Sequence, residues 1–465
     1  MGLVPVIGLE IHAELSTKTK VFCGCENVFG AGPNECCCPV CLGLPGALPM
    51  LNRKAVELAM AAGIMLGSRI SLKTRWDRKN YFYPDLTKAY QISQLYAPIC
   101  IGGGLEINGR FIRLNRIHLE EDAGKLSHER GISKMDYNRA GVPLIEIVTE
   151  PDLASPEEAV AFVERVRQTL VYGGICDGKM EQGSLRVDAN ISLRPDWSET
   201  LGTRTEIKNL NSFRFIKKAL ESEIERQGEV LSSHGRVTQE TRRFDEASGE
   251  TFSMRLKEDS HDYRYFPDPD IPEVIITQQE VDDTRNACPE PPASRLVRYT
   301  KTLGLSSRDA EAILSLRQAA DFFDLAISAG APPKQAANVV NGELTRLLLE
   351  SGADVAPLKV SDFIQALELS SNGKLSPDSL KRTIQELFAG KTFEEATKGL
   401  IITQDLSLVA EAARQVLEAE PDAVAKYKGG NTKVLSYLVG KCMGKLKGKA
   451  HPAAVSEEIK KALES

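Results

Sequence analysis

The sequence predicts an α+β protein, with a mixed or antiparallel sheet domain followed by an all-helical part. Residues 1–290 contain segments that alternate apolar and polar residues, as strands do. The segment CPEPPASR, residues 288–295, is rich in proline and is predicted to be a linker. After it the apolar residues follow helical spacing. The 465 residues are enough for roughly two to four domains.

Three segments of the first part are predicted strands with one polar face each. Side chains alternate between the two faces of a strand, so residues two apart lie on the same side. The predicted strands and their polar faces are PVIGLEIHAEL (5–15) with Glu10 and His12, LRVDANISL (185–193) with Arg186, Asp188 and Asn190, and RTEIKNL (204–210) with Glu206 and Lys208.

Two helices are predicted in the first part and several in the second. The first begins at Ser155, where Ser155-Pro156-Glu157-Glu158 has the pattern of a capping box, and ends at Gly173-Gly174. The second covers residues 212–227. The helices predicted after the linker cover 307–328, 333–350, 361–369, 377–388 and 407–419, and a last one follows Gly429-Gly430-Asn431.

Composition limits the class of protein. The formal net charge is −6, so overall charge does not indicate a nucleic-acid partner, and any basic surface must be local. Residues 1–12 have no basic segment and reach an acid early, which is unlike a signal peptide. No apolar run approaches the ~20 residues of a membrane span. We therefore expect a cytoplasmic protein.

Residues 22–41, FCGCENVFGAGPNECCCPVC, contain six of the ten cysteines. In a reducing cytosol such a cluster favours a metal over disulfides. The pairs Cys23-x-Cys25 and Cys38-x-x-Cys41 have the spacing of a structural Zn²⁺ site, in which four thiolates leave no open position for chemistry. Thiols without a metal are the alternative, and Cys36 or Cys37 could replace one ligand.

Carboxylates gather in two further segments. HLEEDAGK (118–125) holds Glu120, Glu121 and Asp122, and GVPLIEIVTEP (141–151) places Glu146 inside an apolar run. A carboxylate in such a run is costly unless it is paired or bound to a cation. Carboxylate-rich sites suit Mg²⁺, which commonly accompanies nucleotide phosphates. For Glu10 and His12 a strand face turned to solvent is the competing interpretation.

Basic residues occur in two places. WDRKNYFYPD (76–85) has Arg78 and Lys79 among tyrosines, as in phosphate-holding or base-stacking segments, although an edge strand with aromatic packing fits equally. Residues 426–449 hold seven lysines and no acid, which indicates either a phosphate-binding surface or a solvated helix end. The sequence has no P-loop, no G-x-G-x-x-G and no G-x-S-x-G motif.

Taken together, these motifs resemble the B subunits of the bacterial aspartyl/glutamyl-tRNA(Asn/Gln) amidotransferases, the GatCAB complexes. The resemblance covers about residues 6–272, and the helical remainder resembles the helical and YqeY-like tail domains of that family less distinctively. The motifs that carry it are VIGLEIHAEL, CPVCLGLPGALPMLN, DRKNYFYPDLTKAYQISQ, HLEEDAGK, PLIEIVTEPD, GSLRVDANISLRP, TEIKNLNSF, QETRRFDEASGET and DYRYFPDPDIP.

The resemblance implies a catalytic cradle domain with the zinc motif in residues 1–291, a helical domain in 292–403 and a tRNA-binding, YqeY-like tail in 404–465. It implies an ATP-dependent ligase that amidates misacylated Glu-tRNA(Gln) or Asp-tRNA(Asn). ATP phosphorylates the side-chain carboxylate, and ammonia then displaces phosphate. The implied partners complete a heterotrimer: an amidase subunit releases the ammonia from glutamine, and a small linker subunit joins the assembly.

The resemblance also implies roles for single residues. Those expected to bind Mg²⁺ are His12, Glu121 and Glu146, with Glu10 beside them. Those expected to serve phosphoryl transfer are Lys79, then Arg78, with Asp188 and Glu206 in the same polar cavity. Those expected to bind zinc are Cys23, Cys25, Cys38 and Cys41, and those expected to hold tRNA are Lys433, Lys441, Lys445 and Lys447. A non-catalytic, zinc-containing tRNA-binding protein is the alternative.

Overall fold

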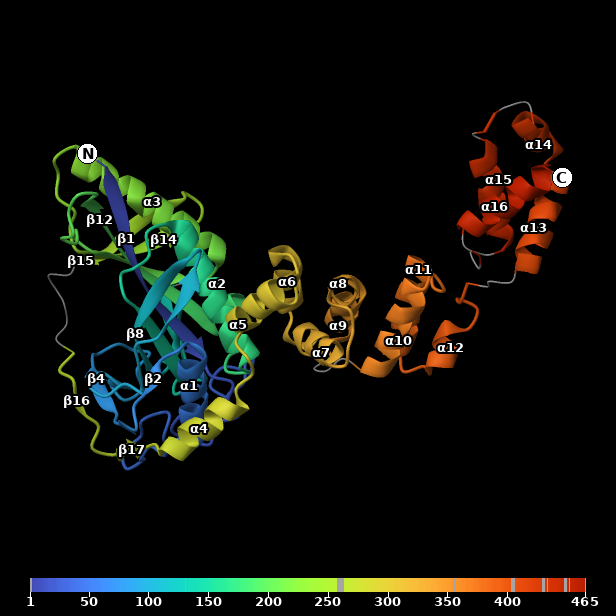
Figure 1. Ribbon diagram of the computed structural model, residues 1–465. Helices are drawn as coiled ribbons and strands as arrows, with labels where there is room; N and C mark the ends of the chain where they lie inside the picture. Colours follow the sequence, from blue (N-terminus) through green and yellow to red (C-terminus); the bar gives the residue numbers. More distant parts are fainter. Residues whose placement is uncertain are drawn as a thin grey trace. The chain divides into compact units, whose positions relative to one another are not determined.

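The computed structural model confirms the α+β class. It divides into two compact units, Met1–Ala293 and Ser294–Ser465, which are described separately below (Figure 1). The residues that it describes are 2–129, 131–256, 263–353, 357–402, 406–428, 431–432, 434–446, 450 and 452–464. Among these, no helix is long and apolar enough to cross a membrane.

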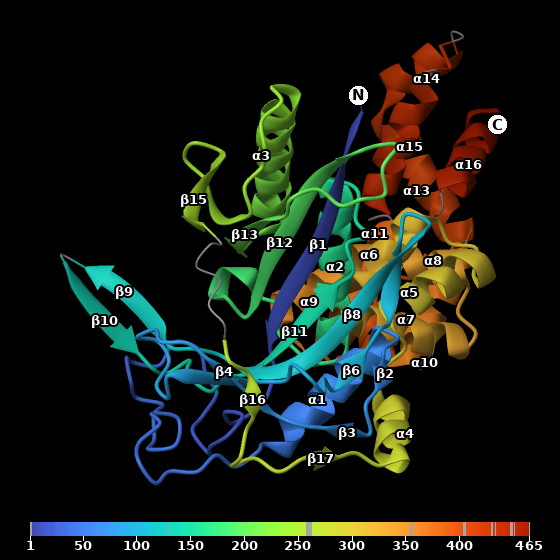
Figure 2. The same cartoon turned by 90° about the vertical axis from the view of Figure 1, so that its left-hand side faces the viewer.

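A ten-stranded sheet organises the described part of the first unit (Figure 2). Its strands pair antiparallel, except that β13 and β14 are parallel, and β7 pairs with β8 off the main path. In spatial order the strands are β15 (Glu250–Leu256), β14 (Glu240–Asp245), β13 (Thr205–Leu210), β12 (Leu185–Pro195), β1 (Leu3–Glu14), β11 (Pro143–Thr149), β8 (Arg110–Glu121), β6 (Cys100–Ile101) and β2 (Arg69–Ile70), with β7 at Gly104–Ile107.

The two faces of this sheet differ in polarity, as the alternation along the strands predicts. On β1 the residues Ile7, Leu9 and Ile11 are at most 1% exposed and form the apolar face, whereas Glu10 and His12 lie on the opposite face. Helices pack against the sheet, with α2 contacting β1 and α3 contacting β12, and Figure 2 shows α2 behind the strands. The core therefore lies on one side and leaves the other side polar.

The helices of the first unit are α1 (Arg53–Met65), α2 (Pro156–Tyr172), α3 (Phe213–Ser232) and α4 (Gln278–Ala287). The prediction for α2 is confirmed, because the Ser155 side chain accepts a hydrogen bond from Glu158 N. The capping box is incomplete, since the Glu158 carboxylate accepts from Ala154 N instead. Helix α3 begins as predicted and continues beyond residue 227 to Ser232.

Short strands outside the main sheet place the segment around residue 79. Strand β4 (Asp77–Asn80) pairs with β5 (Tyr90–Ser93) and with β16 (Phe266–Pro267). The other short pairs are β3 (Lys73–Thr74) with β17 (Val274–Ile275), and β9 (Lys125–Glu129) with β10 (Ile132–Asp136). Segments near residues 80 and 265 are thus held side by side.

The second unit is helical, as predicted, but with shorter helices than the pattern indicates. The stretch 307–328 is two helices separated at Ser315 and Leu316, and 333–350 contains a π-helical turn at Val340–Leu344. The predicted linker is shorter, because α5 begins at Pro292, a residue suited to the first helical position. The helices are α5 (Pro292–Val297), α6 (Ser307–Leu314), α7 (Arg317–Ser328), α8 (Pro333–Val339), α9 (Thr345–Ser351), α10 (Val360–Ser371), α11 (Pro377–Phe388) and α12 (Phe393–Thr397).

The last four helices share a hydrophobic core. Its most buried members include Ala413, Leu438, Cys442, Val455 and Ile459, all at 0% exposure. These helices are α13 (Leu406–Ala419), α14 (Pro421–Lys428), α15 (Val434–Lys445) and α16 (Pro452–Glu464). A common core is what a separate tail domain requires, while the boundary at residues 403 and 404 stays a prediction.

Candidate active site on the polar sheet face

Charged residues form a row across four neighbouring strands of the polar face. His12 on β1 lies directly opposite Glu146 on β11 and Arg186 on β12, and Glu146 lies opposite His118 on β8. Residues directly opposite in an antiparallel pair point to the same face and have neighbouring side chains. The sheet register therefore brings together residues from distant parts of the sequence.

One cluster on this face contains two carboxylates and two imidazoles. Glu146 Oε2 lies 3.5 Å from His12 Nε2 and 3.4 Å from His118 Nε2. Glu120 lies 3.8 Å from each of the same two nitrogens. Donor atoms of His12, Glu120 and Glu146 all lie within 4.8 Å of one another. This is a donor set that can hold a divalent cation.

The charges of this cluster stabilise one another. Burial opposes ionisation of Glu146, but the charges and hydrogen bonds of His118 and His12 hold the pKa of Glu146 well below its usual range. Burial likewise opposes protonation of His118, yet Glu146 and Glu120 raise the pKa of His118 to about 9. Glu146 and the two imidazoles thus favour one another's charged forms, because Glu146 raises the pKa of His12 as well.

Glu121 does not belong to this cluster, so the structure does not bring it together with His12 and Glu146 as the resemblance implies. Its carboxylate accepts hydrogen bonds from Lys88 Nζ at 2.8 Å and from Ile92 N at 2.9 Å. Strand alternation explains this difference, because Glu120 and Glu121 point to opposite faces of β8. The signal is present in the sequence, where His118 and Glu120 are two residues apart and alternate with apolar Ile117 and Leu119.

A second carboxylate cluster lies next to the first on the same face. Donor atoms of Glu10, Asp188 and Glu206 lie within 4.8 Å of one another. Lys208 Nζ lies 3.0 Å from Asp188 Oδ2 and 2.9 Å from Glu206 Oε1. Burial and the charge of Glu146 raise the pKa of Glu10. The structure thus brings all three predicted carboxylates together, and it adds Lys208 as their counter-charge.

A β-bulge places Lys208. The register between β12 and β13 shifts between Val187 and Ala189, at the position of Asp188. Asn209 has a φ of 61°, in the left-handed region, and its N–H donates to Asp188 Oδ1 at 2.9 Å. Bulges of this kind redirect side chains next to functional sites. The alternation of the sequence alone cannot reveal one.

Lys79 and Arg78 point to opposite sides of β4. Lys79 Nζ lies 5.0 Å from the centre of the Tyr263 ring and 5.9 Å from that of Tyr81. Burial by itself lowers the pKa of Lys79, but the negative charges of carboxylates on the polar face, Glu120 first, outweigh it and raise that pKa. Lys79 is therefore a half-buried cation in the electrostatic field of the first cluster.

Arg78 has a different environment. Its Nε and one terminal nitrogen donate to Asp268 Oδ2 and Asp270 Oδ2, each at 2.7 Å. Its guanidinium also lies 4.2 Å from the centre of the Tyr90 ring. These partners attach β4 to residues 268–270. The structure does not bring Arg78 to the carboxylate clusters.

Four cysteines lie as a zinc site requires. The Sγ atoms of Cys23, Cys25, Cys38 and Cys41 lie within 4.8 Å of one another, including a Cys38–Cys41 separation of 3.9 Å. Thiolates ~2.3 Å from a tetrahedral zinc stand ~3.8 Å apart. A hydrogen bond with Cys23, together with the charge of the fully buried Lys20, lowers the pKa of Cys41 to about 4.

The lysines of the tail are only partly described. Lys433 and Lys447 lie outside the described residues. Lys445 is exposed at the end of α15. Lys441 Nζ pairs with Glu420 Oε1 at 3.1 Å and lies 5.4 Å from the centre of the Tyr437 ring. One of the predicted tRNA contacts therefore has an internal partner.

Comparison with known proteins identifies the family of this chain. A family model described as the GatB/GatE catalytic domain matches residues 5–282, and one described as the GatB domain matches residues 321–463. A protein of Geobacter sulfurreducens, named as the B subunit of an aspartyl/glutamyl-tRNA(Asn/Gln) amidotransferase, is 48% identical, and the match covers 100% of both chains.

Two further relatives carry the same name. The protein of Ruminiclostridium cellulolyticum is 46% identical over 100% of this chain and 98% of its own length. That of Thermodesulfovibrio yellowstonii is 46% identical over 98% of both chains. On this evidence the chain belongs to the GatB family of tRNA amidotransferase B subunits.

Proposed function

We propose that this chain carries the ATP-dependent step by which Glu-tRNA(Gln), Asp-tRNA(Asn) or both are converted to the amides. The observation that supports this assignment is the polar sheet face, where two carboxylate clusters lie together and the half-buried cation Lys79 experiences the charges of the first. Phosphoryl transfer depends on positioning and on neutralising charge, and this face supplies groups for both.

The reaction has two steps. First, a side-chain carboxylate oxygen of the aminoacyl group attacks the γ-phosphorus of ATP, the bond from that phosphorus to the β–γ bridging oxygen breaks, and ADP leaves. Second, the ammonia nitrogen attacks the acyl carbon, phosphate leaves, and the nitrogen loses a proton to give the amide. Activation is needed because a carboxylate has no good leaving group, whereas an acyl phosphate has one.

The residues of the first cluster fit Mg²⁺. His12, Glu120 and Glu146 offer one imidazole and two carboxylates from three adjacent strands, and Glu10, Asp188 and Glu206 offer three more carboxylates beside them. When bound, the ion would neutralise charge on the phosphates. The chain's own part is to hold Glu146 ionised and to place the carboxylates of both clusters on one sheet face.

Lys79 is proposed to stabilise the transferring phosphoryl group. The rings of Tyr81 and Tyr263 lie beside its ammonium, and no described carboxylate lies within ion-pair distance of it. A half-buried cation without a close counter-ion is well suited to an incoming anion.

The remaining parts serve assembly and stability in this proposal. A partner amidase supplies ammonia from glutamine, and a small linker protein completes the complex. The four cysteines hold structural zinc. The lysines of the tail contact the tRNA backbone, with Lys445 the described candidate that is exposed.

The test is tRNA-dependent ATP hydrolysis by the assembled complex. Glu146→Gln should abolish that hydrolysis and amide formation, while the glutaminase activity of the partner amidase stays. Glu150→Gln is the matched control, because Glu150 directly follows the same strand and bonds Asn115 outside the clusters. If the wild-type complex shows no tRNA-dependent ATP hydrolysis, that result would support the alternative of a non-catalytic tRNA-binding protein. The two partly buried carboxylate clusters disfavour that alternative, since carboxylates repel phosphates unless a cation intervenes.

A further inference from the structure

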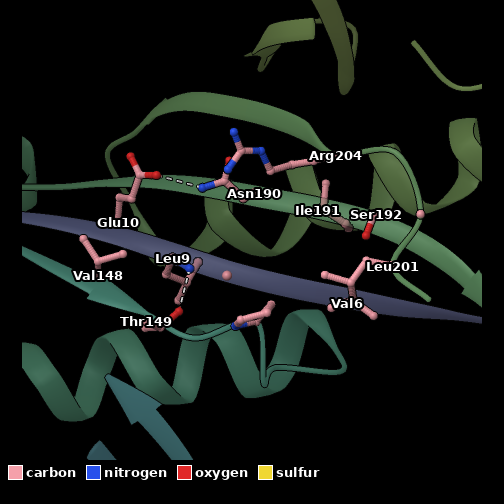
Figure 3. A pocket seen from close by; sticks show the side chains of 13 residues that line it. Val6, Leu9, Glu10, Val148, Thr149, Asn190, Ile191, Ser192, Leu201 and Arg204 are labelled. Carbon is pink, nitrogen blue, oxygen red and sulfur yellow. Dashed lines mark hydrogen bonds between the residues drawn. The ribbon is translucent and has the colours of Figure 1, made fainter. Parts of the chain in front are cut away.

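A cavity of about 220 Å³ opens on the polar face of the main sheet (Figure 3). Glu10 lines it, and the carboxylate of Glu10 accepts a hydrogen bond from Asn190 Nδ2 at 2.9 Å. Because Glu10 also belongs to the second carboxylate cluster, this cavity is part of the candidate active site. Lys20 does not line it and has no role in the proposed reaction.

Lys20 is a completely buried lysine. Its side chain is 0% exposed, and lysines are almost never fully buried unless they are paired. Its Nζ donates to Tyr137 O at 3.2 Å and forms no ion pair with a carboxylate of the described residues. A carbonyl oxygen carries only a partial charge, so this hydrogen bond does not balance a buried cation. Lys20 therefore needs an anion that its hydrogen bond does not supply.

The backbone places Lys20 beside the cysteine site. Lys20 N donates to Cys25 O at 3.0 Å, so Lys20 begins the turn that carries Cys23 and Cys25. A Cβ added at Gly141 would lie 3.7 Å from Lys20 Cδ and 3.7 Å from Cys41 Cβ. The lysine is thus attached to one cysteine pair through its backbone and lies next to the other through its side chain.

The groups around Lys20 leave the thiols as its counter-ion. A small cavity of about 20 Å³ is lined by Lys20, Cys23 and Cys41. Glu121 also lines it, but the Glu121 carboxylate is paired with Lys88 at 2.8 Å. The volume suffices for about one water molecule, which has no charge to offer. Among the residues that line this cavity, the cysteines are therefore the groups left to balance Lys20, and its charge acts on the Cys41 thiol.

A zinc site made of four cysteines needs a cation in turn. Four thiolates exceed the charge of one Zn²⁺ by two units. Cys41 is only 5% exposed, so part of this excess lies away from water, where it is costly. An ammonium beside the sulfur atoms lowers that cost. Partners that support the ligands of a metal in this way are typically worth ~10- to 100-fold in affinity.

We propose that Lys20 is the counter-cation of the zinc-bound thiolates, and that its charge, rather than its hydrogen bond, strengthens zinc binding by the four cysteines. This inference rests on the proposed structural zinc. The competing role is a structural one, in which the hydrogen bond to Tyr137 O supports the fold equally with and without metal. Such a role leaves the zinc affinity unchanged, because a ligand's affinity depends only on the difference between the free and bound states.

The test measures the zinc affinity of the assembled complex by competition with a chelator that changes colour on binding zinc. Lys20→Met removes the charge and the hydrogen bond, whereas Lys20→Gln removes the charge and keeps an N–H donor. Both variants should bind zinc ~10- to 100-fold more weakly than the wild type. Lys18→Met is the matched control, because Lys18 is exposed two residues earlier, and it should bind zinc as the wild type does.

Replacement of the zinc by Co²⁺ gives a second measurement. Thiolate-bound Co²⁺ absorbs light by transferring an electron from sulfur to the metal. Loss of a nearby positive charge raises the energy of the sulfur electrons and reduces the energy of this transfer. The absorption should therefore move to longer wavelength in Lys20→Met and Lys20→Gln, and it should stay in place in Lys18→Met.

Two outcomes overturn the inference. One is wild-type zinc affinity in Lys20→Gln, which would assign the role of Lys20 to its hydrogen bond. The other is weaker zinc binding with an unmoved Co²⁺ absorption, which would assign the loss to a distorted site. If Lys20→Met fails to fold, Lys20→Gln still decides, because it keeps a polar group near Tyr137 O. A wild-type complex without bound zinc would instead refute the proposed zinc site itself.

Discussion

The two adjacent carboxylates of β8 offer the sharpest test of the site, because the structure gives them opposite roles. Glu120 faces His12 and His118 at 3.8 Å, whereas Glu121 pairs with Lys88 at 2.8 Å. We therefore expect Glu120→Gln to weaken binding of a divalent cation and Glu121→Gln to leave that binding within about threefold of wild type.

The magnitude follows from the geometry. A unit charge about 4 Å from another contributes about 4 kcal/mol at an effective dielectric constant near 20. Because 1.4 kcal/mol is a factor of about ten, and because glutamine keeps one oxygen ligand, the dissociation constant should rise ~10²- to 10³-fold in Glu120→Gln. Glu121→Gln should instead lower the free energy of unfolding by about 3 kcal/mol, since it removes the buried charge that pairs with the half-buried Lys88.

The assay is a titration of the complex with Mn²⁺, in which free Mn²⁺ is followed by electron paramagnetic resonance and Mg²⁺ serves as a competitor. Thermal melting of both variants supplies the stability comparison. The reasoning is refuted if Glu120→Gln binds Mn²⁺ as the wild type does, or if Glu121→Gln weakens binding equally while melting normally.

Three further predictions concern other parts of the chain. Cys38→Ser should reduce bound zinc, measured by atomic absorption, and lower the melting temperature. Cys36→Ser, the control, should change neither. Loss of zinc in both variants would add Cys36 to the set of ligands. Glu223→Gln should reduce the free energy of unfolding by about 3 kcal/mol at about pH 7, while the exposed Glu225→Gln stays near wild type. Although burial opposes ionisation of Glu223, hydrogen bonds from neighbouring guanidinium and amide groups lower its pKa. The stabilisation that Glu223 provides is thus present above its unfolded-state pKa of ~4.3 and is lost as pH falls through its lower native-state pKa. The free energies of unfolding of the wild type and of Glu223→Gln should therefore converge in acid. Lys79→Ala should lower kcat for tRNA-dependent ATP hydrolysis at least ~10²-fold, with partial rescue by Lys79→Arg; an unaltered kcat in the alanine variant contradicts its role.

The strands and their polar faces could be predicted from sequence because both depend on a local period of two. That period places Glu10 with His12, and Asp188 on the polar side of its strand. The same rule, applied to residues 116–121, selects Glu120 with His118. The resemblance implies Glu121 instead, whereas the local alternation predicts the residue that the structure places beside His12, which is Glu120.

Other features depend on which strands become neighbours, and no local pattern contains that. The row from His118 to Arg186 requires the order β8, β11, β1, β12, which joins residues distant in sequence. The bulge at Asn209 and the π-helical turn at Val340–Leu344 are likewise set by packing. The cavity beside Glu10 needs the loop before β13 to return over β12.

The loop of residues 22–41, which carries the four clustered cysteines, shows how a segment without catalytic groups can still support the site. Cys41 O accepts a hydrogen bond from Thr87 Oγ1 at 2.8 Å, which attaches the loop to the segment leading into β5. Gln91 on β5 donates to Glu121 O at 2.8 Å, and Ile92 N donates to the Glu121 carboxylate. Glu121 is thus the end of a chain of contacts that begins at the four thiols.

Because Glu120 directly precedes Glu121 on β8, whatever fixes Glu121 also fixes the orientation of Glu120 on the opposite face. Four thiolates that close around a metal leave it no open position, so their effect on catalysis must pass through these contacts. Removing zinc with a chelator should therefore change the Mn²⁺ affinity of the first cluster, which contains Glu120, before the removal unfolds the sheet. A cluster whose Mn²⁺ affinity stays constant until global melting would show that the loop only adds stability.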